Sequence, residues 1–333
     1  MAEQRFLVVR LGSLGDIVHT FPAVAGLRES FPSAEIIWLT HPRWAELVAS
    51  SRLATEIWRV DSRDLGCVRQ VLRKIRGADW MAAIDYQGLW KSATLPFLGG
   101  VDKRIGFSAA TIREFGVPIL YTERVACRTT HIADQNGELT LRTGAAKAVG
   151  EVILEVAEAD CELVRKELQE QGATRYVVLS PGGGWRSKCW PVERFGALCQ
   201  KIRGELGIPC VINYGPGEES LVAAVQAASG DARPVAYDGE MGPLMALLRG
   251  AQCIVGGDTG PLHLGIALGA RGVALFGPTD PARNGPYPPQ QIVLRSPGAQ
   301  TTYGRRDTPD PSLLALSVEE VFDAVRKSVG KDT

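Results

Sequence analysis

The stretch from residue 253 to residue 281 holds five residues whose types could bind an anion. They are Asp258, Thr259, Gly260, His263 and Thr279. Apolar runs predict strands at 253–255 and 272–276, with a helix at 260–268 between them and Asp258 and Thr259 as its N-caps. A helix start offers unpaired N–H groups and a positive dipole end, which suit a diphosphate. The alternative is a capped helix with His263 simply packed. We favour the anion site because all five residues fall at one end of these elements.

A glycine-rich turn in the same half of the chain suggests the same chemistry. Residues 180–184 read SPGGG after a predicted strand, and Lys188 follows shortly. Gly183 and Gly184 expose their N–H groups, and a lysine can neutralise phosphate charge. No GK[ST] sequence closes the turn, so it is not a Walker loop. Lys188 could instead be an isolated surface lysine, but the neighbouring glycines favour a phosphate contact.

A second turn of small residues, GSLGD at 12–16, follows the first predicted strand. A dinucleotide-binding GxGxxG fingerprint would need glycine where Arg10 stands, and no ribose-binding acid follows the second strand, so a nicotinamide dehydrogenase is a poor fit. Ser13 and Gly15 let a substrate approach the backbone beside Asp16. The alternative role for Asp16 is a helix cap.

The elements that must position these residues alternate between strand and helix. Strands are predicted at 5–11, 35–39, 57–60, 81–86 and 104–107, and again at 176–180, 210–214, 234–237, 253–255 and 272–276. Helical patterns separate them, which implies mostly parallel, doubly wound sheets. A chain of 333 residues has room for two domains. We predict an α/β protein with domains at 1–172 and 173–316 and a closing helix at 317–333.

The composition restricts the function classes. Apolar residues make up 45% of the chain and charged residues 22%, and 37 basic residues balance 37 acidic ones, which excludes nucleic-acid binding over the whole surface. The seven cysteines are scattered without a CxxC, which indicates neither disulfides nor a zinc site and suggests the reducing cytoplasm. We see no signal peptide and no run of 18 apolar residues, so we predict a cytoplasmic protein without a transmembrane segment. We also predict no tightly bound metal and no other cofactor, because no cluster of metal-binding carboxylates is visible.

Several motifs, taken as an ordered set, resemble one enzyme family. They are RLGSLGDIVHTFPA at 10–23, DYQGLWKSA at 85–93, SKCWP at 187–191, DTGPLH at 258–263 and FGPTDP at 276–281. The set resembles the bacterial lipopolysaccharide heptosyltransferases of glycosyltransferase family 9, with heptosyltransferase I as the most similar subgroup. The resemblance touches both halves and most of the length of the chain.

This resemblance implies the GT-B fold, in which two Rossmann-like doubly wound domains face a central cleft. The first domain would bind the acceptor and the second the nucleotide-sugar donor, and the closing helix would pack back on the first domain. The implied reaction moves L-glycero-D-manno-heptose from ADP-heptose to a Kdo residue of the lipopolysaccharide inner core, with inversion at the anomeric carbon. Because the acceptor is lipid A carrying Kdo, the protein would be peripheral to the inner face of the cytoplasmic membrane.

The resemblance also implies roles for single residues. Asp16 would be the general base, and Lys188 would contact the donor phosphates and stabilise the departing charge. Glu218 would meet the ribose hydroxyls, with Glu219 left open as the alternative. On the acceptor side, Gln87 and Lys91 would face the cleft.

Basic residues of the first domain are candidates for binding an acidic acceptor. They are Arg59, Arg63, Arg113, His131 and Arg142. Taken individually, each residue of this type is more often a solvated surface charge, and Arg113, within TIREFG, is the best placed by resemblance. A further basic group lies on a predicted amphipathic helix and could be a solvent face or a membrane-surface patch. Its members are Arg69, Arg73, Lys74 and Arg76.

Two alternatives stay open for the function. The same architecture could use another sugar nucleotide or acceptor, because nothing in the sequence reads the base or the sugar. The chain could also be an inactive nucleotide-binding relative, although the presence of Asp16 and Lys188 argues against this.

Overall fold

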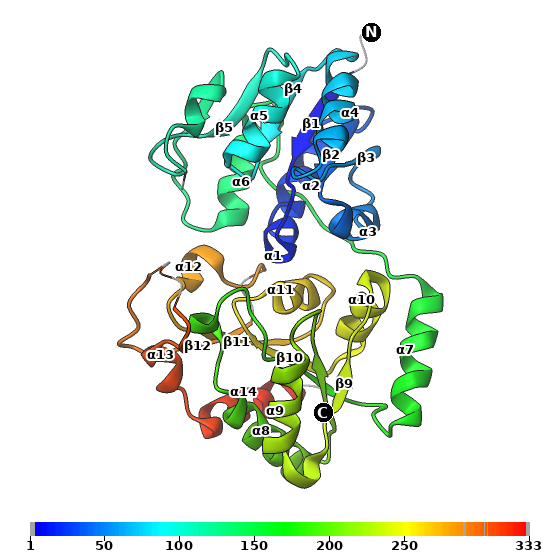
Figure 1. Ribbon diagram of the computed structural model, residues 1–333, viewed down its shortest axis with the longest axis vertical. Coiled ribbons are helices and arrows are strands. Elements are labelled where there is room, and N and C mark those ends of the chain that lie inside the picture. The colour runs from blue at the N-terminus through cyan, green and yellow to red at the C-terminus, as the bar shows by residue number, and fades with distance from the viewer. Residues whose placement is uncertain (1–3, 113, 289–290, 303, 305, 331–333) are drawn as a thin grey trace. The chain divides into compact units, whose positions relative to one another are not determined.

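The computed structural model describes residues 4–330, apart from 113, 289–290, 303 and 305. The chain folds into two compact units, Met1–Glu155 and Val156–Thr333. Each unit has its own sheet and its own set of helices (Figure 1).

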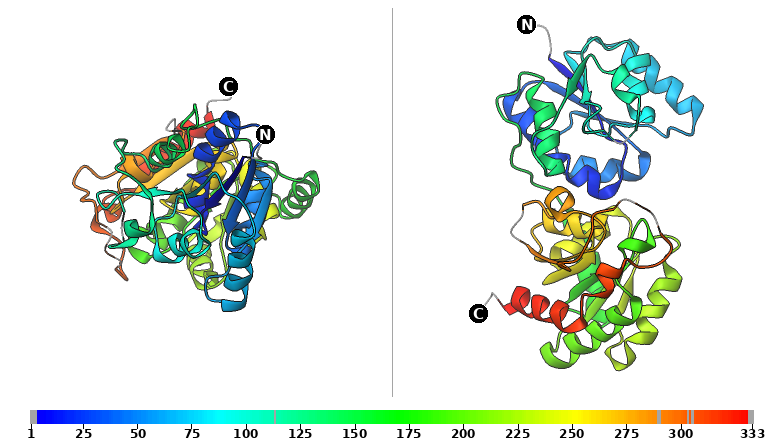
Figure 2. Two further views of the ribbon diagram at one scale, coloured as in Figure 1. Left: turned by 90° about the horizontal axis from the view of Figure 1, so that it is seen from above. Right: turned by 90° about the vertical axis from the view of Figure 1, so that its left-hand side faces the viewer.

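The first unit is built on a six-stranded parallel sheet with the order β3-β2-β1-β4-β5-β6. Its strands are β1 (Arg5–Val9), β2 (Glu35–Thr40), β3 (Glu56–Arg59), β4 (Ala82–Asp85), β5 (Arg104–Phe107) and β6 (Glu123–Val125). Its helices are α1 (Leu14–Val18), α2 (Phe21–Ser30), α3 (Ala45–Ser50), α4 (Leu65–Arg76), α5 (Trp90–Leu98) and α6 (Ile132–Leu141), with short 3₁₀ turns η1 (Pro42–Trp44) and η2 (Val117–Leu120). Helices cover both faces of the sheet, where α2 packs with α6 and α4 packs with α5 (Figure 2).

The second unit repeats this plan with the order β12-β11-β10-β7-β8-β9. Its strands are β7 (Val177–Ser180), β8 (Cys210–Asn213), β9 (Val235–Tyr237), β10 (Cys253–Gly257), β11 (Gly272–Phe276) and β12 (Ile292–Arg295). Its helices are α7 (Glu158–Glu170), α8 (Val192–Lys201), α9 (Glu219–Ala228), α10 (Met241–Gly250), α11 (Gly260–Ala267), α12 (Pro281–Asn284), α13 (Pro311–Leu314) and α14 (Val318–Val329). Short turns η3 (Arg186–Lys188) and η5 (Gly230–Ala232) are 3₁₀, and η4 (Ile202–Leu206) is π-helical.

Both sheets reverse their direction of winding at the same relative position. In the first sheet β1 lies between β2 and β4, and in the second β7 lies between β8 and β10. In register, Val9 is paired with Asp85 and Ser180 with Gly256. Ligands of open α/β sheets bind beyond the carboxyl ends of the strands at such a switch point. The loops after β1 and β4 therefore meet at one switch point, and those after β7 and β10 meet at the other.

The central strands are apolar along their length because helices cover both sheet faces. Residues 6–9 of β1 are fully buried, and so are Ile254 and Val255 of β10. On one face of the first sheet, Leu7 and Val9 pack with Val71 and other residues in a core built from α4 and α5. The predicted α/β doubly wound architecture is thus confirmed for each unit.

The structure differs from the predicted fold in three places. Edge strands β6 and β12 were not predicted: β6 has three residues with one apolar side chain, and β12, which reads IVLR, lies between two stretches rich in proline and glycine. The division between the units falls after Glu155, not after residue 172, because α7 packs against α10 of the second unit. Helix α14 was expected on the first domain, but its buried residues Val321, Phe322 and Val325 belong to the core of the second unit.

Candidate active site

Lys188, Asp258 and His263 form one cluster in the second unit. Nζ of Lys188 donates to Oδ2 of Asp258 at 2.6 Å, and Nε2 of His263 lies 3.0 Å from Oδ1 of the same carboxylate. The Lys188 ammonium also lies 4.8 Å from the centre of the Trp185 ring, a cation–π distance. Lys188 and Asp258 meet because β7 and β10 are adjacent strands. Three of the predicted donor-binding residues are therefore in direct contact.

The buried carboxylate of Asp258 organises this cluster. Its side chain is 10% exposed and that of Lys188 is 16% exposed. Burial alone would raise the pKa of Asp258, but the hydrogen bond with His263 and the charge of Lys188 together outweigh burial and hold this pKa well below its usual range. Asp258 is therefore ionised at neutral pH and fixes the positions of the lysine and histidine side chains.

Helix α11 begins beside the cluster, with Thr259 at its N-cap position and Gly260 as its first residue. The expectation that Asp258 also caps this helix is wrong, because its carboxylate is bonded to Lys188 and His263 instead. Within the described part of the chain, no group hydrogen bonds to the buried hydroxyl oxygens of Thr259 and Thr279. Buried hydroxyls in native proteins usually have a partner, so these two oxygens mark positions where a ligand can supply one.

The turn after β7 lies against the loop after β8. A β-carbon at Gly182 would overlap Oε1 of Glu218, so a larger residue here would push the Glu218 carboxylate out of its present position. Oε2 of Glu218 accepts a hydrogen bond from the N–H of Gly215 at 2.9 Å, and the side chain is half-buried. Glu219, by contrast, is exposed in the first turn of α9. Of the two glutamates, Glu218 lies beside the glycine-rich turn.

The other two glycines of this turn differ in their surroundings. A β-carbon on Gly183 would lie 3.1 Å from Sγ of Cys189 and 3.6 Å from Cγ2 of Thr259, so this backbone runs close to the start of α11. Gly184 is exposed, and no described atom lies within 4 Å of the position that its β-carbon would take. The turn therefore brings Gly183 to the cluster and leaves open space at Gly184.

Asp16 lies in the first turn of α1 on the first unit, where Ser13 is the N-cap residue. The N–H and hydroxyl groups of Ser13 donate to Oδ2 of Asp16 at 3.2 and 3.0 Å, and Nη2 of Arg10 lies 2.7 Å from Oδ1. Gly15 precedes Asp16 within the helix and is half-buried. The Asp16 side chain is still 47% exposed, so a substrate hydroxyl can reach the carboxylate.

The loop after β4 is tied to the loop after β1. Oε1 of Gln87 accepts a hydrogen bond from the N–H of Leu11 at 2.7 Å. The buried carboxylate of Asp85 holds the same loop with four hydrogen bonds of 2.7–3.2 Å. Its donors are the N–H groups of Gln87 and Gly88 and the hydroxyls of Ser92 and Tyr121. Burial raises the pKa of Asp85, although these four hydrogen bonds oppose the shift.

The basic residues predicted for the acceptor are spread over the first unit. Lys91 is exposed in the first turn of α5, four residues after Gln87 in the chain. Arg63 is exposed in the loop after β3, which is the edge strand and is separated from β1 by β2. Arg113 lies outside the described residues.

Two further basic residues have contacts that define their places. Nδ1 of His131 accepts from the N–H of Ala133 and so caps α6, at the carboxyl edge of the sheet. Arg142 lies 3.8 Å from Glu123 at the amino end of β6, which is the opposite edge of the sheet. The sequence argument for Arg142 as an acceptor-binding residue is therefore wrong.

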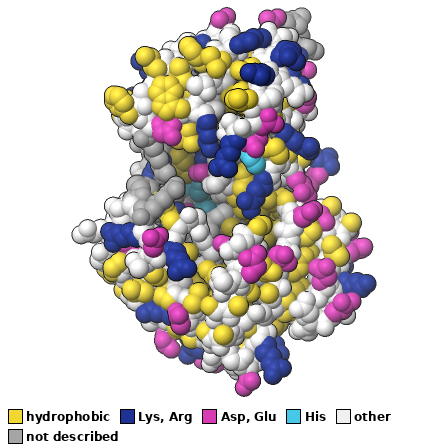
Figure 3. Space-filling model, viewed as in Figure 1, with side chains coloured by type: hydrophobic (Ala, Val, Ile, Leu, Met, Phe, Trp, Pro, Cys, Tyr) yellow, Lys and Arg dark blue, Asp and Glu magenta, His cyan; other side chains and the backbone are white. Residues whose placement is uncertain are grey.

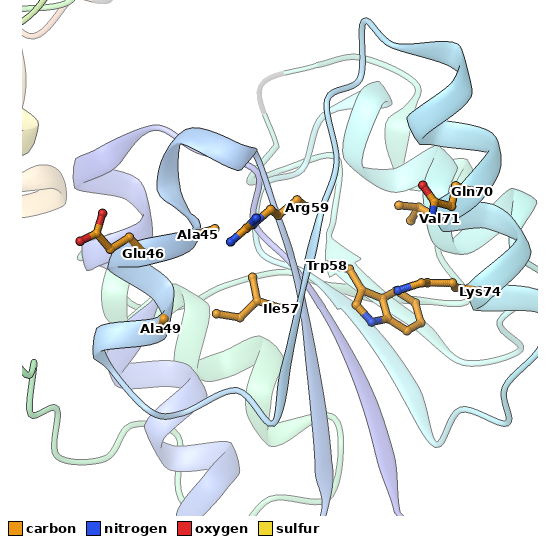
Figure 4. A pocket seen from close by; sticks show the side chains of 9 residues that line it. All are labelled: Ala45, Glu46, Ala49, Ile57, Trp58, Arg59, Gln70, Val71 and Lys74. Carbon is orange, nitrogen blue, oxygen red and sulfur yellow. The ribbon is translucent and has the colours of Figure 1, made fainter. Parts of the chain in front are cut away.

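A groove with a volume of about 680 Å³ opens on the first unit between α3 and α4, over β3 (Figure 4). Trp58, Arg59 and Lys74 line it, and the Lys74 ammonium lies 5.0 Å from the centre of the Trp58 ring. The four basic residues of α4 are exposed, while Val71 and Ile75 on the same helix are buried, as the amphipathic pattern predicts. Neither Asp16 nor Gln87 lines this groove, so it is separate from the predicted site.

Sequence reasoning missed two residues that hold the first unit's loops. Arg10 is buried, donates to the carbonyl oxygen of Tyr86, and carries the charge that contacts Asp16. Asp85 holds the Gln87 loop as described above. Each is a charged residue at the carboxyl end of an apolar run, and that pattern is the signal that could have identified both.

Comparison with known proteins identifies one family from the sequence and a shared fold from the structure. The family model described as Glycosyltransferase family 9 (heptosyltransferase) matches residues 68–311. Lipopolysaccharide heptosyltransferase 1 of Pseudomonas aeruginosa is 27% identical over 313 residues, which cover 88% of this chain and 84% of that protein. The protein of the same name from Escherichia coli strain K12 is 29% identical over 313 residues, which cover 88% of this chain and 94% of that protein.

Solved structures superpose over nearly the whole chain. The glycosyl transferase family 9 structure from Veillonella parvula has a TM-score of 0.84 at 23% identity, and covers 99% of this chain and 98% of its own. The E. coli heptosyltransferase WaaC with ADP has a TM-score of 0.76 at 24% identity, and covers 98% of this chain and 100% of its own. These structures share the pair of Rossmann-like units. Because the family model spans most of the sequence, this chain belongs to glycosyltransferase family 9, the heptosyltransferases.

Proposed function

We propose that this protein transfers L-glycero-D-manno-heptose from ADP-heptose to a Kdo residue of the lipopolysaccharide inner core, with inversion at the anomeric carbon. The observation that carries the proposal is the cluster of Lys188, Asp258 and His263 beside the start of α11. The relatives named lipopolysaccharide heptosyltransferase 1 support the sugar and the pathway.

The donor diphosphate would bind at the start of α11. The N–H groups of the first helical turn, including Gly260, point toward such an anion, and the hydroxyls of Thr259 and Thr279 are buried without a described partner. Lys188 has three donors and uses part of them on Asp258, so it can bridge this carboxylate and a phosphate oxygen. His263, in the same helical turn, adds a further donor.

The glycine-rich turn and Glu218 would bind the remainder of the nucleotide. Gly183 and Gly184 have no side chain, so their N–H groups can approach the diphosphate closely. Glu218 lies beside Gly182 and is half-buried, which suits a carboxylate that accepts hydrogen bonds from ribose hydroxyls.

Catalysis would start at Asp16. Its carboxylate takes the proton from the acceptor hydroxyl as that oxygen bonds to the anomeric carbon, and the bond from this carbon to the phosphate oxygen breaks. Arg10 and Ser13 hold the carboxylate in place. The negative charge that develops on the departing ADP would be stabilised by Lys188, His263 and the N–H groups of α11. Attack from the face opposite the leaving group gives the inverted product.

The acceptor would bind on the first unit. Ser13 and Gly15 lie beside Asp16, Gln87 is anchored to Leu11 at the same switch point, and Lys91 is exposed nearby in the chain. Arg63 and Arg113 remain proposed acceptor contacts on the strength of their charge. Because the acceptor is embedded in a membrane, the protein would act at the inner face of the cytoplasmic membrane. In the described residues, the structure has no helix long and apolar enough to cross it.

We further propose that the reaction needs no metal ion held by the protein, because Lys188, His263 and α11 supply the donors that a diphosphate requires. Transfer should persist after exhaustive chelation. Activity that vanishes on chelation and returns with magnesium would contradict this charge-stabilising role.

The function is tested by incubating the protein with ADP-heptose and heptose-free lipid A carrying Kdo, followed by mass spectrometry. The expected result is an acceptor heavier by one heptose. A panel of other nucleotide sugars and acceptors is the control. Transfer from another nucleotide sugar, with none from ADP-heptose, would refute the proposed sugar. ADP binding without any turnover would indicate an inactive relative.

A further inference from the structure

Five large apolar side chains are exposed on one part of the first unit, and we call them the apolar patch. They are Trp90, Phe97, Leu98, Phe115 and Ile119. Phe115 is 98% exposed and Ile119 is 70% exposed. Figure 3 shows hydrophobic side chains grouped over the upper left of the view, where the segment between β5 and β6 lies in Figure 1.

Contacts between neighbouring elements make the patch continuous. A β-carbon on Gly116 would lie 3.0 Å from the ring of Trp90, so the backbone next to Phe115 runs against that ring. The Arg104 guanidinium lies 5.4 Å from the centre of the Phe97 ring and donates to the carbonyl oxygen of Leu120, the residue after Ile119. The start of α5, the end of α5 and the η2 turn therefore form one surface.

The described residues of the first unit leave the apolar patch uncovered. The inward side of α5 is already packed, because Leu95 joins the core of the first sheet and Ala93 joins Val117, Leu120 and Tyr121 in a small core. Helix α5 is thus apolar on both sides, although a helix at a watery surface normally carries polar residues on its outer side. An exposed apolar surface rimmed by polar residues marks an interaction site.

Basic side chains border the patch. Lys91 follows Trp90 in α5, and the Arg76 guanidinium donates to the carbonyl oxygen of Leu98 at 2.9 Å. The acidic neighbours are Glu114, whose carboxylate accepts from the N–H of Trp90 at 2.8 Å, and the exposed Asp102. Aromatic side chains flanked by lysine and arginine are the composition that suits a bilayer interface with anionic lipids.

We propose that the apolar patch docks this protein onto the surface of an anionic phospholipid bilayer. Phe115 and Ile119 enter the interfacial region first because they are the most exposed, and Trp90 lies at the rim beside Lys91. Helix α5 begins three residues after Gln87, so docking would bring the acceptor-side loop to the membrane. That link to the acceptor rests on the proposed function, whereas docking itself does not.

Docking is tested by sedimenting the full-length protein with vesicles of phosphatidylethanolamine and phosphatidylglycerol. We expect Phe115→Ser combined with Ile119→Ser to weaken vesicle binding about tenfold or more, since two side chains no longer enter the interface. Ile153→Ser is the matched control, because Ile153 is also 70% exposed on the first unit but lies outside the patch. Binding should also weaken with salt and with vesicles of phosphatidylcholine alone.

Several outcomes would overturn the proposal. These are wild-type protein that does not bind anionic vesicles, a patch variant that binds them as well as the wild type, and a control that loses as much binding as the patch variant. Ultracentrifugation that shows a wild-type dimer and a monomeric patch variant, without vesicle binding, would instead assign the patch to self-association.

Transfer assays separate this proposal from the proposed function. The patch variant should keep its activity on a deacylated, water-soluble Kdo acceptor and lose activity on the lipid-embedded one. Wild-type protein that binds vesicles but transfers heptose to neither acceptor would refute the function and leave docking standing. Wild-type protein that transfers heptose without binding vesicles would refute docking alone.

Discussion

Replacing Lys188 by methionine should weaken ADP binding and destabilise the second unit, and the two effects have separate causes. The substitution keeps most of the apolar stem and removes the ammonium that lies 2.6 Å from Asp258. In the free protein this leaves a buried carboxylate with His263 as its remaining partner. In the complex it removes a charged donor from the proposed diphosphate site.

The size of each effect follows from the burial of the pair. Breaking a buried ion pair by removing one partner costs about 3–5 kcal/mol, and we expect the lower end because His263 still contacts the carboxylate of Asp258. A hydrogen bond to a charged group contributes about 1.5–3 kcal/mol, so the Kd for ADP should rise about 10- to 150-fold. Removing both members of the pair, as Asp258→Asn with Lys188→Met, should restore part of the lost stability.

Calorimetric titration with ADP and urea denaturation measure the two quantities. Lys201→Met is the matched control in the same unit, because Lys201 lies 3.1 Å from Glu205 in a surface i,i+4 pair. That control should change stability little, because surface ion pairs contribute little, and it should leave ADP affinity unchanged. If Lys188→Met stays folded and binds ADP with an affinity within about twofold of wild type, Lys188 is a partner of Asp258 and not a donor-binding residue.

Three further predictions concern single side chains. Asp16→Asn should slow turnover about 10²–10⁴-fold and leave ADP affinity unchanged, as expected for a positioned base; near-normal kcat would reduce Asp16 to a structural role at α1. Gly182→Ala should weaken ADP binding in calorimetry, because the added methyl would displace Glu218, and unchanged affinity would remove Glu218 from the ribose site. The pKa of Asp258 is lower in the folded state than in the unfolded state. The ionised carboxylate therefore stabilises the fold above its unfolded-state pKa of about 4, and this stabilisation is lost as pH falls through the folded-state pKa. The free-energy difference between wild type and Asp258→Asn in urea should therefore shrink below about pH 4, and a constant difference would contradict the assignment.

The sequence predicted the loops of the site better than the contacts within them. Glycines, polar residues and apolar runs are local signals, so the turns at Asp16, at Gly183 and at Asp258 could be placed at strand ends. The bond between Lys188 and Asp258 depends on which strands are neighbours, and no local pattern shows that β7 lies beside β10. For the same reason the sequence assigned Asp258 to its own helix, although the lysine and the histidine bind it.

The contacts of charged residues were the other failure. Arg10 follows an apolar strand and was treated as a reason against a dinucleotide fingerprint, but its own contacts with Asp16 and Tyr86 were not predicted. Arg142 was chosen for its charge, and the structure places it beside Glu123 at the other edge of the sheet. The charge of a residue does not show at which edge of the sheet the residue lies, because that depends on the topology of the sheet.

The contact between α7 and α10 determines which fragment of the chain keeps the second unit intact. Buried Val164 and Leu168 of α7 lie on the second unit, which begins at Val156. A fragment that starts at residue 173, where the sequence alone suggested a boundary, would strip α7 away and expose the apolar residues of α10 beneath it. Such a fragment should aggregate during expression. One that starts at Val156 keeps this cover, and it is the piece to label for NMR titration with ADP.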